Sequence, residues 1–401
     1  MTARRPGRDA EHLDGAFAEF SLLRGRFNQF AARTAHRLFG GGALSFEILL
    51  SGLLWLILAA LVILEGHHRK FFSLDAAAIH ARMLVAVPLF LWCSALLDRA
   101  ARDACASLVK VGIVAGAAKD VLDRQATRLA RLFNSALLQV VLVVGVVAIG
   151  LLTPRDYLPG VSSFAGNMTD DVAGSLAGRW YVWVCLPVFR FVLLRLCVMF
   201  LLWTYLIWKL SRQRLHLVAS HPDRAGGLGL LEVAQTQLLI FVLAIAVIDA
   251  AAFAEMSRLS ELIEQDVYVH SFLIALVGLA VICGPLLFLS APLFQCRRLG
   301  NIEFGALAHE YSTLFRKRWI ETGSAEHDNL LGASDIQSLA DLDGSYQNVR
   351  TMRVLPVTGT LVVVILGCAA VPHLPLLLLK YPMTDLISDL VQTMIGVEGR
   401  Q

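Results

Sequence analysis

The chain has 401 residues, of which 57% are hydrophobic and 17% are charged, with a net charge of +3 and a mean hydropathy of +0.64. Such an apolar, charge-poor composition excludes an ordinary soluble domain and indicates a polytopic membrane protein. The seven cysteines are odd in number, show no C-x-x-C spacing and fall mostly in apolar runs, which argues against a disulfide framework or a thiolate metal site.

Residues 1–43 form a basic amphipathic segment. Between residues 13 and 39, apolar side chains recur at spacings of three and four, with four arginines among them. The apolar residues are Phe17, Phe20, Leu23, Phe27 and Phe30. This spacing predicts a helix with a basic face. Its apolar face could lie in an anionic cytoplasmic leaflet, or it could dock on the cytoplasmic surface of the protein's own helical bundle.

Seven later segments are long enough to cross a bilayer, since a helix needs roughly 20 apolar residues to span about 30 Å of hydrocarbon. They are residues 44–64, 76–97, 132–153, 180–208, 238–256, 269–296 and 354–379. The second segment differs from the others in having His80 and Arg82 near its start. The expected fold class is all-α: a polytopic membrane bundle of about seven transmembrane helices within residues 44–401.

The distribution of Lys and Arg predicts the orientation of this bundle. The segment before the first span and the loops after the second, fourth and sixth spans carry 25 of them, and the other three loops carry 5. Because short cytoplasmic loops retain positive charge, we expect a cytoplasmic N-terminus and, with seven spans, a periplasmic C-terminus.

Two charged segments between spans show helical periodicity. Residues 98–131 predict a cytoplasmic helical hairpin, and residues 297–353 predict further cytoplasmic helices that lead into the last span. Together these extensions could form a compact layer below the membrane or a contact between copies of the chain. One expected partner of the chain is therefore a second copy of itself, in a homo-oligomer.

The loop between the fourth and fifth spans contains the turn HPDRAGGLG. Its polar residues and first glycines are His221, Asp223, Arg224, Gly226 and Gly227. The proline discourages the preceding helix from continuing, and the glycines permit left-handed backbone angles. Such a turn offers free amides beside an arginine at a helix start, which could bind a phosphate or carboxylate. The alternative is a structural corner, in which the aspartate and arginine pair with nearby loops.

Three segments resemble a known family. HPDRAGGLG at residues 221–229, DIQSLADL at 335–342 and LVAVPL at 84–89 are similar to stretches of bacterial multi-pass membrane proteins that have no assigned activity. The resemblance runs through most of the chain from the first span. It implies the bacterial inner membrane as the location, and it implies nothing about chemistry.

The sequence contains few residues in the patterns typical of catalytic or metal-binding sites. The chain has no H-E-x-x-H motif, no nucleophile with a recognisable partner signature, and no paired intramembrane histidines at haem-like spacing. We therefore expect no metal, no cofactor and no nucleic-acid partner, and nothing points to an enzyme.

Polar residues inside the predicted spans form the second candidate site. They are His80, Arg82, Arg190, Arg195, Asp249 and Glu255. An arginine at the centre of a lone span costs about 2.5–3.5 kcal/mol on insertion scales, so such charges usually face a bundle interior or a wet cavity. The offset of five residues separates Arg190 from Arg195 by about 140° around the helix. The predicted depth of Asp249 lies between those of the two arginines.

We expect these six side chains to form a polar cluster that opens toward the outside and ends near the middle of the membrane. Three arginines against two carboxylates would make it net positive and favour a small anion. The alternative is a set of structural salt bridges that fix helix packing, with Arg82 and Glu255 reaching toward the interface.

The functional hypothesis that follows is a channel or transporter for a small anionic solute. A second hypothesis is a membrane sensor or assembly protein that does not transport and binds a cytoplasmic partner through the N-terminal helix. A third is an intramembrane enzyme that acts on a lipid-linked substrate at the HPDRAGGLG turn.

Overall fold

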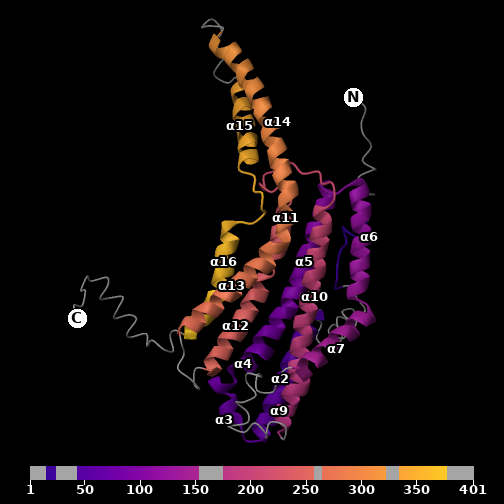
Figure 1. The fold of residues 1–401 in the computed structure, drawn as a ribbon, viewed down its shortest axis with the longest axis vertical. Coiled ribbons are helices and arrows are strands. Elements are labelled where there is room, and N and C mark those ends of the chain that lie inside the picture. The colour runs from indigo at the N-terminus through magenta and orange to yellow at the C-terminus, as the bar shows by residue number, and fades with distance from the viewer. Residues whose placement is uncertain (1–14, 24–42, 153–174, 257–263, 322–333, 377–401) are drawn as a thin grey trace, which may run out of the picture.

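The computed structural model describes residues 15–23, 43–152, 175–256, 264–321 and 334–376, and these ranges contain helices and no strand (Figure 1). Six helical stretches are long and apolar enough to cross a membrane. They are Glu47–Leu64, Ala77–Lys110, Leu176–Ser211, Gly229–Glu255, Val267–Leu287 and Gly359–Leu376. The prediction of an all-α fold with several helices able to span a membrane is confirmed for the described residues.

The elements follow one another in two groups along the chain. The first group is α2 (Ala43–Leu64), α3 (His68–Phe71), η1 (Leu74–Ala76), α4 (Ala77–His80), η2 (Ala81–Ala86), α5 (Val87–Lys110), α6 (Gly116–Phe133) and α7 (Ala136–Leu152). The second group is α9 (Leu176–Trp180), η5 (Tyr181–Cys185), α10 (Leu186–Ser211), α11 (Gly229–Thr236), α12 (Leu239–Met256), α13 (Glu264–Leu287), α14 (Ser290–Arg316), η6 (Lys317–Glu321), α15 (Ser334–Arg350), α16 (Gly359–Ala370) and η8 (Val371–His373).

Helix α12 is the central packing element. It contacts α4, η2 and α5 as well as α13, α16 and η8, while α2 and α10 pack on α5. The ring of Phe90 on α5 is fully buried and lies 6.0 Å from that of Phe189 on α10 and 5.8 Å from that of Phe241 on α12. These aromatic contacts bring three predicted spans together in one core.

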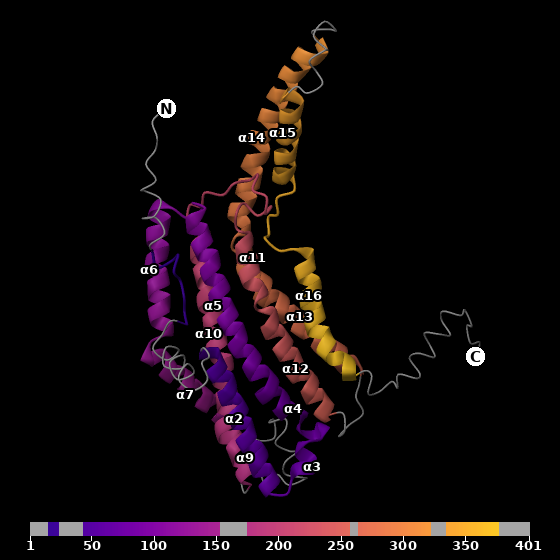
Figure 2. The same ribbon diagram turned by 180° about the vertical axis from the view of Figure 1, so that it is seen from behind.

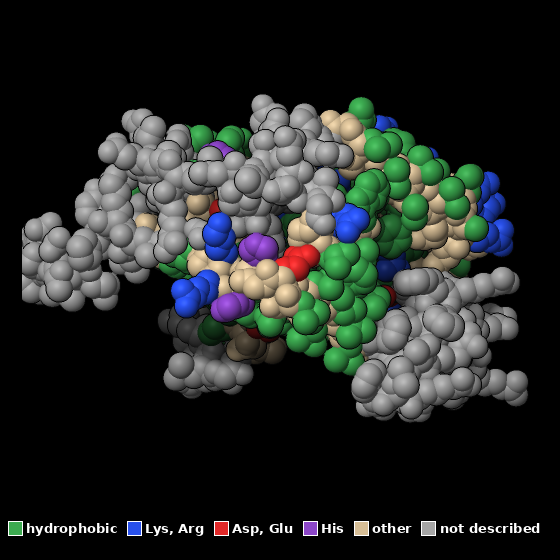
Figure 3. Space-filling view, turned by 90° about the horizontal axis from the view of Figure 1, so that it is seen from below, with side chains coloured by type: hydrophobic (Ala, Val, Ile, Leu, Met, Phe, Trp, Pro, Cys, Tyr) green, Lys and Arg blue, Asp and Glu red, His purple; other side chains and the backbone are tan. Residues whose placement is uncertain are grey.

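The two ends of the molecule differ in character. At one end α14 and α15 pack as a hairpin that projects away from the bundle, and at the other end lie α3 and α9 (Figures 1 and 2). Seen from the α3 end, basic, acidic and histidine side chains gather near the centre of the face, beside apolar ones (Figure 3). Helix α3 contributes His68, Arg69 and Lys70 to this end. Which end faces the cytoplasm remains a prediction.

Three predicted boundaries differ from the structure. Helix α5 continues to Lys110, so the second predicted span and the first part of segment 98–131 are one helix. The sixth predicted span breaks after Leu287, and α14 begins at Ser290, where Pro292 suits a first turn whose amides need no carbonyl partner. The third predicted span corresponds to α7, which is long enough to cross a membrane only when it is taken together with α6, and the two helices are bent by 50°.

The amphipathic helix predicted for the N-terminal segment is not formed over residues 15–23, the described part of it. Phe17 donates its backbone amide to Oδ1 of Asp123 on α6 at 2.7 Å, and Leu22 donates its amide to Oδ1 of Asp98 on α5 at 2.7 Å. Amides held by carboxylates cannot also donate to carbonyls one helical turn earlier. Tertiary hydrogen bonds thus replace the predicted helical ones at Phe17 and Leu22, whereas the amide of Glu19 still donates to the backbone oxygen of Gly15 at 3.1 Å.

Apolar side chains of the same stretch dock on the protein. Phe17 is 1% exposed and Phe20 is 3% exposed, and the Phe20 ring stacks on Trp203 of α10 at 6.2 Å. Of the two arrangements expected for the N-terminal segment, this part adopts docking on the bundle. Residues 24–42 lie outside the described ranges, so contact of the segment with anionic lipid stays a prediction. Residues 377–401 also lie outside these ranges, and the periplasmic position of the C-terminus stays a prediction.

The α14–α15 hairpin keeps apolar side chains on its open face. Tyr311 turns toward α15 and donates its hydroxyl to the backbone oxygen of Asp335 at 3.0 Å. Large side chains on α14 remain exposed, namely Leu299, Ile302, Leu307 and Leu314. If copies of the chain contact one another as predicted, these exposed apolar side chains on α14 offer a surface for that contact.

Candidate functional site

Two widened helical turns lie inside the bundle, each followed by a proline. The π-helical turn η2 precedes Pro88, and the π-helical turn η5 precedes Pro187. Proline has no amide to donate, and its ring crowds the carbonyl four residues earlier, so the preceding turn opens. Arg82 and Tyr181 stand at equivalent places, each six residues before its proline.

These two residues meet between the helices. An Nη of Arg82 donates to the hydroxyl oxygen of Tyr181 at 2.8 Å, with 8% of Arg82 and 1% of Tyr181 exposed. Tyr181 is also within electrostatic reach of the buried Glu255 at the end of α12. The half-buried Arg190 on α10, nine residues after Tyr181, lies within electrostatic range of both Tyr181 and Arg82. We call Arg82, Tyr181, Arg190 and Glu255 the Tyr181 cluster.

Contacts with α2 place the Tyr181 cluster along the bundle axis. Ser51 donates its hydroxyl to the backbone oxygen of Met83, the neighbour of Arg82, at 2.8 Å. Trp180, the neighbour of Tyr181, donates its ring N–H to the backbone oxygen of Leu54 at 3.2 Å. Ser51 and Leu54 lie near the middle of α2, so the cluster lies well inside the apolar part of the bundle.

Three members of the Tyr181 cluster belong to the six predicted site residues, and sequence reasoning missed the tyrosine. A signal for it existed, because Tyr181 and Arg82 share the same spacing to a proline within an apolar run.

His80 has a structural environment of its own. Its Nδ1 accepts a hydrogen bond from the ring N–H of Trp55 at 3.0 Å, and its Nε2 lies 2.7 Å from the backbone oxygen of Phe71. Because an indole nitrogen only donates and a carbonyl only accepts, the ring is neutral with its hydrogen on Nε2. Both nitrogens are used in holding α2 and α3 to α4.

Arg195 and Asp249, which the sequence places at neighbouring depths, have different partners. An Nη of Arg195 lies 3.9 Å from Oε1 of Glu47 on α2, and its guanidinium lies 5.5 Å from the centre of the Phe133 ring. Sequence reasoning missed Glu47, although it is the single charged residue in the first predicted span. The single continuous cluster expected from the sequence is therefore divided into separate contacts.

Asp249 lies between two histidines that sequence reasoning did not connect with it. Its Oδ1 is 3.2 Å from Nδ1 of His270 on α13, and its Oδ2 is 3.0 Å from Nε2 of His373 in η8. Each histidine belongs to another apolar run, and nothing in the sequence pattern says which face of α12 these runs approach.

The HPDRAGGLG turn binds a carboxylate of its own. The carboxylate of Asp223 accepts hydrogen bonds from the amides of Ala225, Gly227 and Gly229 at 2.8, 3.1 and 2.9 Å. Nδ1 of His221 lies 2.8 Å from the same side chain. Amides that the sequence offered to an external anion are thus occupied within the turn, by Asp223 of the turn itself rather than by pairing with nearby loops.

A second set of bonds fastens this turn to the segment before α16. Arg353 donates to Oε2 of Glu232 at 3.0 Å and to the backbone oxygen of Asp223 at 3.1 Å, and its amide donates to the backbone oxygen of Arg224 at 2.7 Å. Arg224, Gly226 and Gly227 all have positive φ angles, of 52°, 64° and 95°. The side chain of Arg224 is exposed.

Replacing Asp223 with asparagine is expected to lower the thermal stability of the protein at neutral pH. Burial acts to raise the pKa of Asp223, but hydrogen bonds from three amides and from His221 outweigh it, and the pKa lies below its ordinary value of 3.8. A carboxyl group with a lowered folded-state pKa stabilises the fold above the unfolded-state pKa, and this stabilisation is lost as the pH falls through the folded-state value.

The difference in midpoint temperature between wild type and Asp223→Asn should therefore be largest near neutral pH and should shrink below about pH 4. Thermal unfolding in detergent over a series of pH values measures it. Asp120→Asn, at an exposed position of α6, is the matched control and should change little. A difference for Asp223→Asn that does not vary with pH would contradict the assignment.

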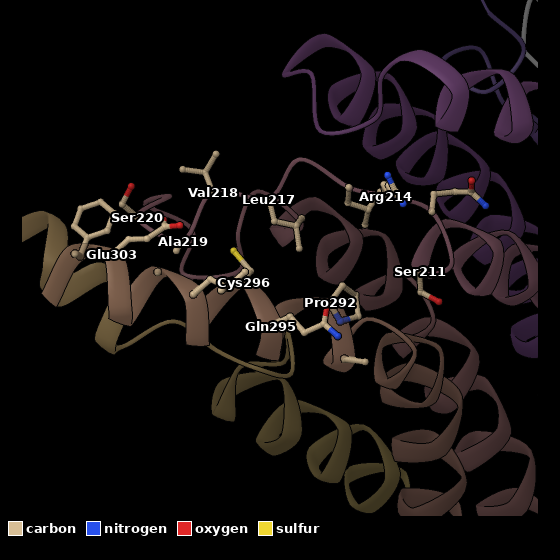
Figure 4. Close-up of a pocket in the computed structure, with 16 residues that line it drawn as sticks. Ser211, Arg214, Leu217, Val218, Ala219, Ser220, Pro292, Gln295, Cys296 and Glu303 are labelled. Atoms are coloured by element: carbon tan, nitrogen blue, oxygen red, sulfur yellow. The ribbon is translucent and has the colours of Figure 1, made fainter. Parts of the chain in front are cut away.

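A pocket of about 690 Å³ lies elsewhere, between residues 211–220 and the first half of α14 (Figure 4). Polar side chains line it on both sides, among them Arg214, Gln295 and Glu303. A Cβ at Gly300 would lie 2.4 Å from Cβ of Ala219, so helix and segment touch at this glycine. The pocket contains none of the residues predicted from the sequence.

No family model, curated protein sequence or solved structure matches this chain. The six to seven apolar helices are compatible with an integral membrane protein. The resemblance to bacterial multi-pass membrane proteins, and the inner membrane that it implies, remain predictions.

Proposed function

We propose that the protein is a channel or transporter for a small anionic solute and that the Tyr181 cluster is its binding site. The observation that supports the proposal is the charge balance of this cluster. Arg82 donates a hydrogen bond to Tyr181 and Arg190 lies within electrostatic range of it, while Glu255 is the one carboxylate among the described residues in electrostatic reach of that tyrosine.

Arg190 is the member best suited to hold an anion. Its guanidinium makes no hydrogen bond or ion pair with any other residue that the structure describes, and it lies about 3.3 Å from where a Cβ would stand at Gly150. Like charges inside a bundle repel each other in a low dielectric, and an anion bound between two arginines would offset that repulsion. A guanidinium also matches carboxylate and phosphate oxygens in a bidentate way.

The proposed site contains fewer of the charged and polar residues than the site expected from the sequence. Arg195 has Glu47 beside it, and His80 has both ring nitrogens engaged, so neither is part of the proposed binding site. The two π-helical turns support the proposal, because such turns are often found at functional sites and leave carbonyls without regular helical partners.

Flux of radioactive chloride, acetate, sulfate and inorganic phosphate into proteoliposomes tests the proposal. Wild type is expected to move at least one of these anions, and Arg190→Gln should reduce that flux at least about tenfold at anion concentrations below saturation, as expected if the anion loses about 1.4 kcal/mol of binding free energy. Arg190→Lys, which keeps the charge but not the planar fork, should retain part of it.

Arg212→Gln is the matched control, because Arg212 lies at the other end of α10 with its guanidinium over Trp208, and flux should be unchanged. Each variant is accepted only if it elutes as a single species in size-exclusion chromatography. Wild-type vesicles that move none of the four anions, or an Arg190→Gln protein that moves them at the wild-type rate, would refute the proposal.

A further inference from the structure

His373 has both ring nitrogens directed at oxygen atoms. Its Nδ1 lies 2.9 Å from the backbone carbonyl oxygen of Ala369, and its Nε2 lies 3.0 Å from Oδ2 of Asp249 on α12. The His373 side chain is 2% exposed and that of Asp249 is 25% exposed. The histidine is therefore held by these two oxygens rather than by solvent.

Counting hydrogens shows that this arrangement has a place for one more proton than neutral imidazole supplies. A carbonyl oxygen only accepts, so Nδ1 of His373 carries a hydrogen. In the neutral ring, Nε2 then has a lone pair that faces the lone pairs of the Asp249 carboxylate. A proton that binds Nε2 gives an imidazolium whose two N–H groups donate to Ala369 and Asp249, so the contact with Asp249 becomes attractive as well.

A second histidine, which is exposed at the surface of the bundle, contacts the same carboxylate. His270 on α13 has its Nδ1 3.2 Å from Oδ1 of Asp249, and its side chain is 46% exposed. An imidazole exchanges protons near physiological pH, and chains of aspartate and histidine in membrane proteins mark proton relays. Asp249 thus lies between an exposed ring and a buried one.

Other titratable and charged groups stand on the elements packed around this trio. Among them are Glu255 on α12, Tyr268 and Cys283 on α13, Cys368 on α16, His80 on α4 and Arg82 on η2. The hydrogen-bonding contacts described for Asp249 go to the two histidines. Within the described ranges, no three His, Cys, Asp or Glu side chains stand where they could hold a metal ion, so the trio does not have metal-site geometry.

We propose that Asp249, His270 and His373 form a proton-binding site that controls the contact between α12 and η8. With the proton bound, His373 and Asp249 attract each other and hold the end of α16 against α12. When the proton leaves Nε2, lone pairs face each other at 3.0 Å and the contact is weakened. Coupling of this site to anion movement rests on the function proposed above, but the proton site itself does not.

Solid-state nitrogen-15 NMR of histidine-labelled wild type in lipid vesicles tests the site directly. The signals of His373 are assigned by their disappearance in His373→Gln, where glutamine keeps a donor for Asp249 but binds no proton. We expect both ring nitrogens of wild-type His373 to carry a proton at some pH within the range from about pH 5 to pH 9. A bare Nε2 on His373 throughout the range from about pH 5 to pH 9 would overturn the proposal.

The pH dependence of anion flux separates this proposal from the function proposed above. If wild type moves an anion, an imposed pH gradient should change the rate at least about twofold, and His373→Gln should respond less than twofold. A gradient response that persists unchanged in His373→Gln would overturn the coupling. If wild type moves no anion, the proposed transport function fails, and the NMR experiment still decides whether His373 holds the proton.

Discussion

Replacing Asp98 with alanine is expected to lower the free energy of unfolding by about 3–5 kcal/mol, because it removes the acceptor from several buried donors at once. Asp98 is 4% exposed and accepts from the hydroxyl of Ser21 at 2.7 Å, the amide of Leu22 at 2.7 Å and the amide of Leu23 at 3.2 Å. It also accepts from Arg102, one turn further along α5, at 2.8 Å. Without the carboxylate, residues 15–23 lose a main attachment to the bundle.

The measurement is chemical denaturation of the purified protein in detergent. Asp103→Ala is the matched control, because Asp103 lies on the same helix at an exposed position, and we expect a change within about 0.5 kcal/mol. Equal stability of the Asp98 and Asp103 variants would show that the segment 15–23 does not depend on this carboxylate. Release of the segment should also raise its rate of amide hydrogen exchange, because Leu22 and Leu23 lose their acceptor.

Arg195→Leu is expected to destabilise the protein by about 3–5 kcal/mol, since it leaves the carboxylate of Glu47 inside the apolar part of α2 without the cation 3.9 Å away. Their side chains are only 12% and 17% exposed. Replacing both residues with leucine removes the stranded charge. The double variant should therefore recover most of the loss, because an apolar pair of similar volume is often as stable as a buried ion pair.

A double-mutant cycle in the same denaturation assay measures this coupling. Arg212→Leu, which removes a cation near the opposite end of α10, should cost much less than Arg195→Leu. Losses for Glu47→Leu and Arg195→Leu that simply add in the double variant would argue against an energetic contact between them. The test is independent of anion flux, so it examines the assignment of Arg195 to the structural pair rather than to the proposed binding site.

The N-terminal segment shows where a local pattern is overruled. Phenylalanines at spacings of three and four predict a helix, and in isolation their backbone amides would bond within it. In the folded protein, Asp98 and Asp123 offer charged acceptors to the amides of Leu22 and Phe17. Charge-assisted hydrogen bonds are stronger than neutral ones, so the tertiary partners prevail. The burial of Phe17 and Phe20 was open to prediction, but their partners were not.

The Tyr181 cluster shows a similar division. Arginines in apolar runs announce a polar site, because their burial in lipid is costly, and this marked Arg82 and Arg190 from the sequence alone. Tyr181 carries no charge and was overlooked, although it repeats the spacing of Arg82 to a following proline. The sequence pattern did not predict that Arg195 pairs with Glu47 or that Asp249 contacts two histidines.

The sequence by itself determined that the chain is helical and that most of its apolar runs match the thickness of a bilayer, because each backbone amide in lipid must be satisfied within its own helix. Only the tertiary structure decided which polar side chains meet. A span that is apolar on all sides has no face marked for the core, so its rotation and neighbours follow from packing against the other helices, as α12 illustrates between η2 and η8.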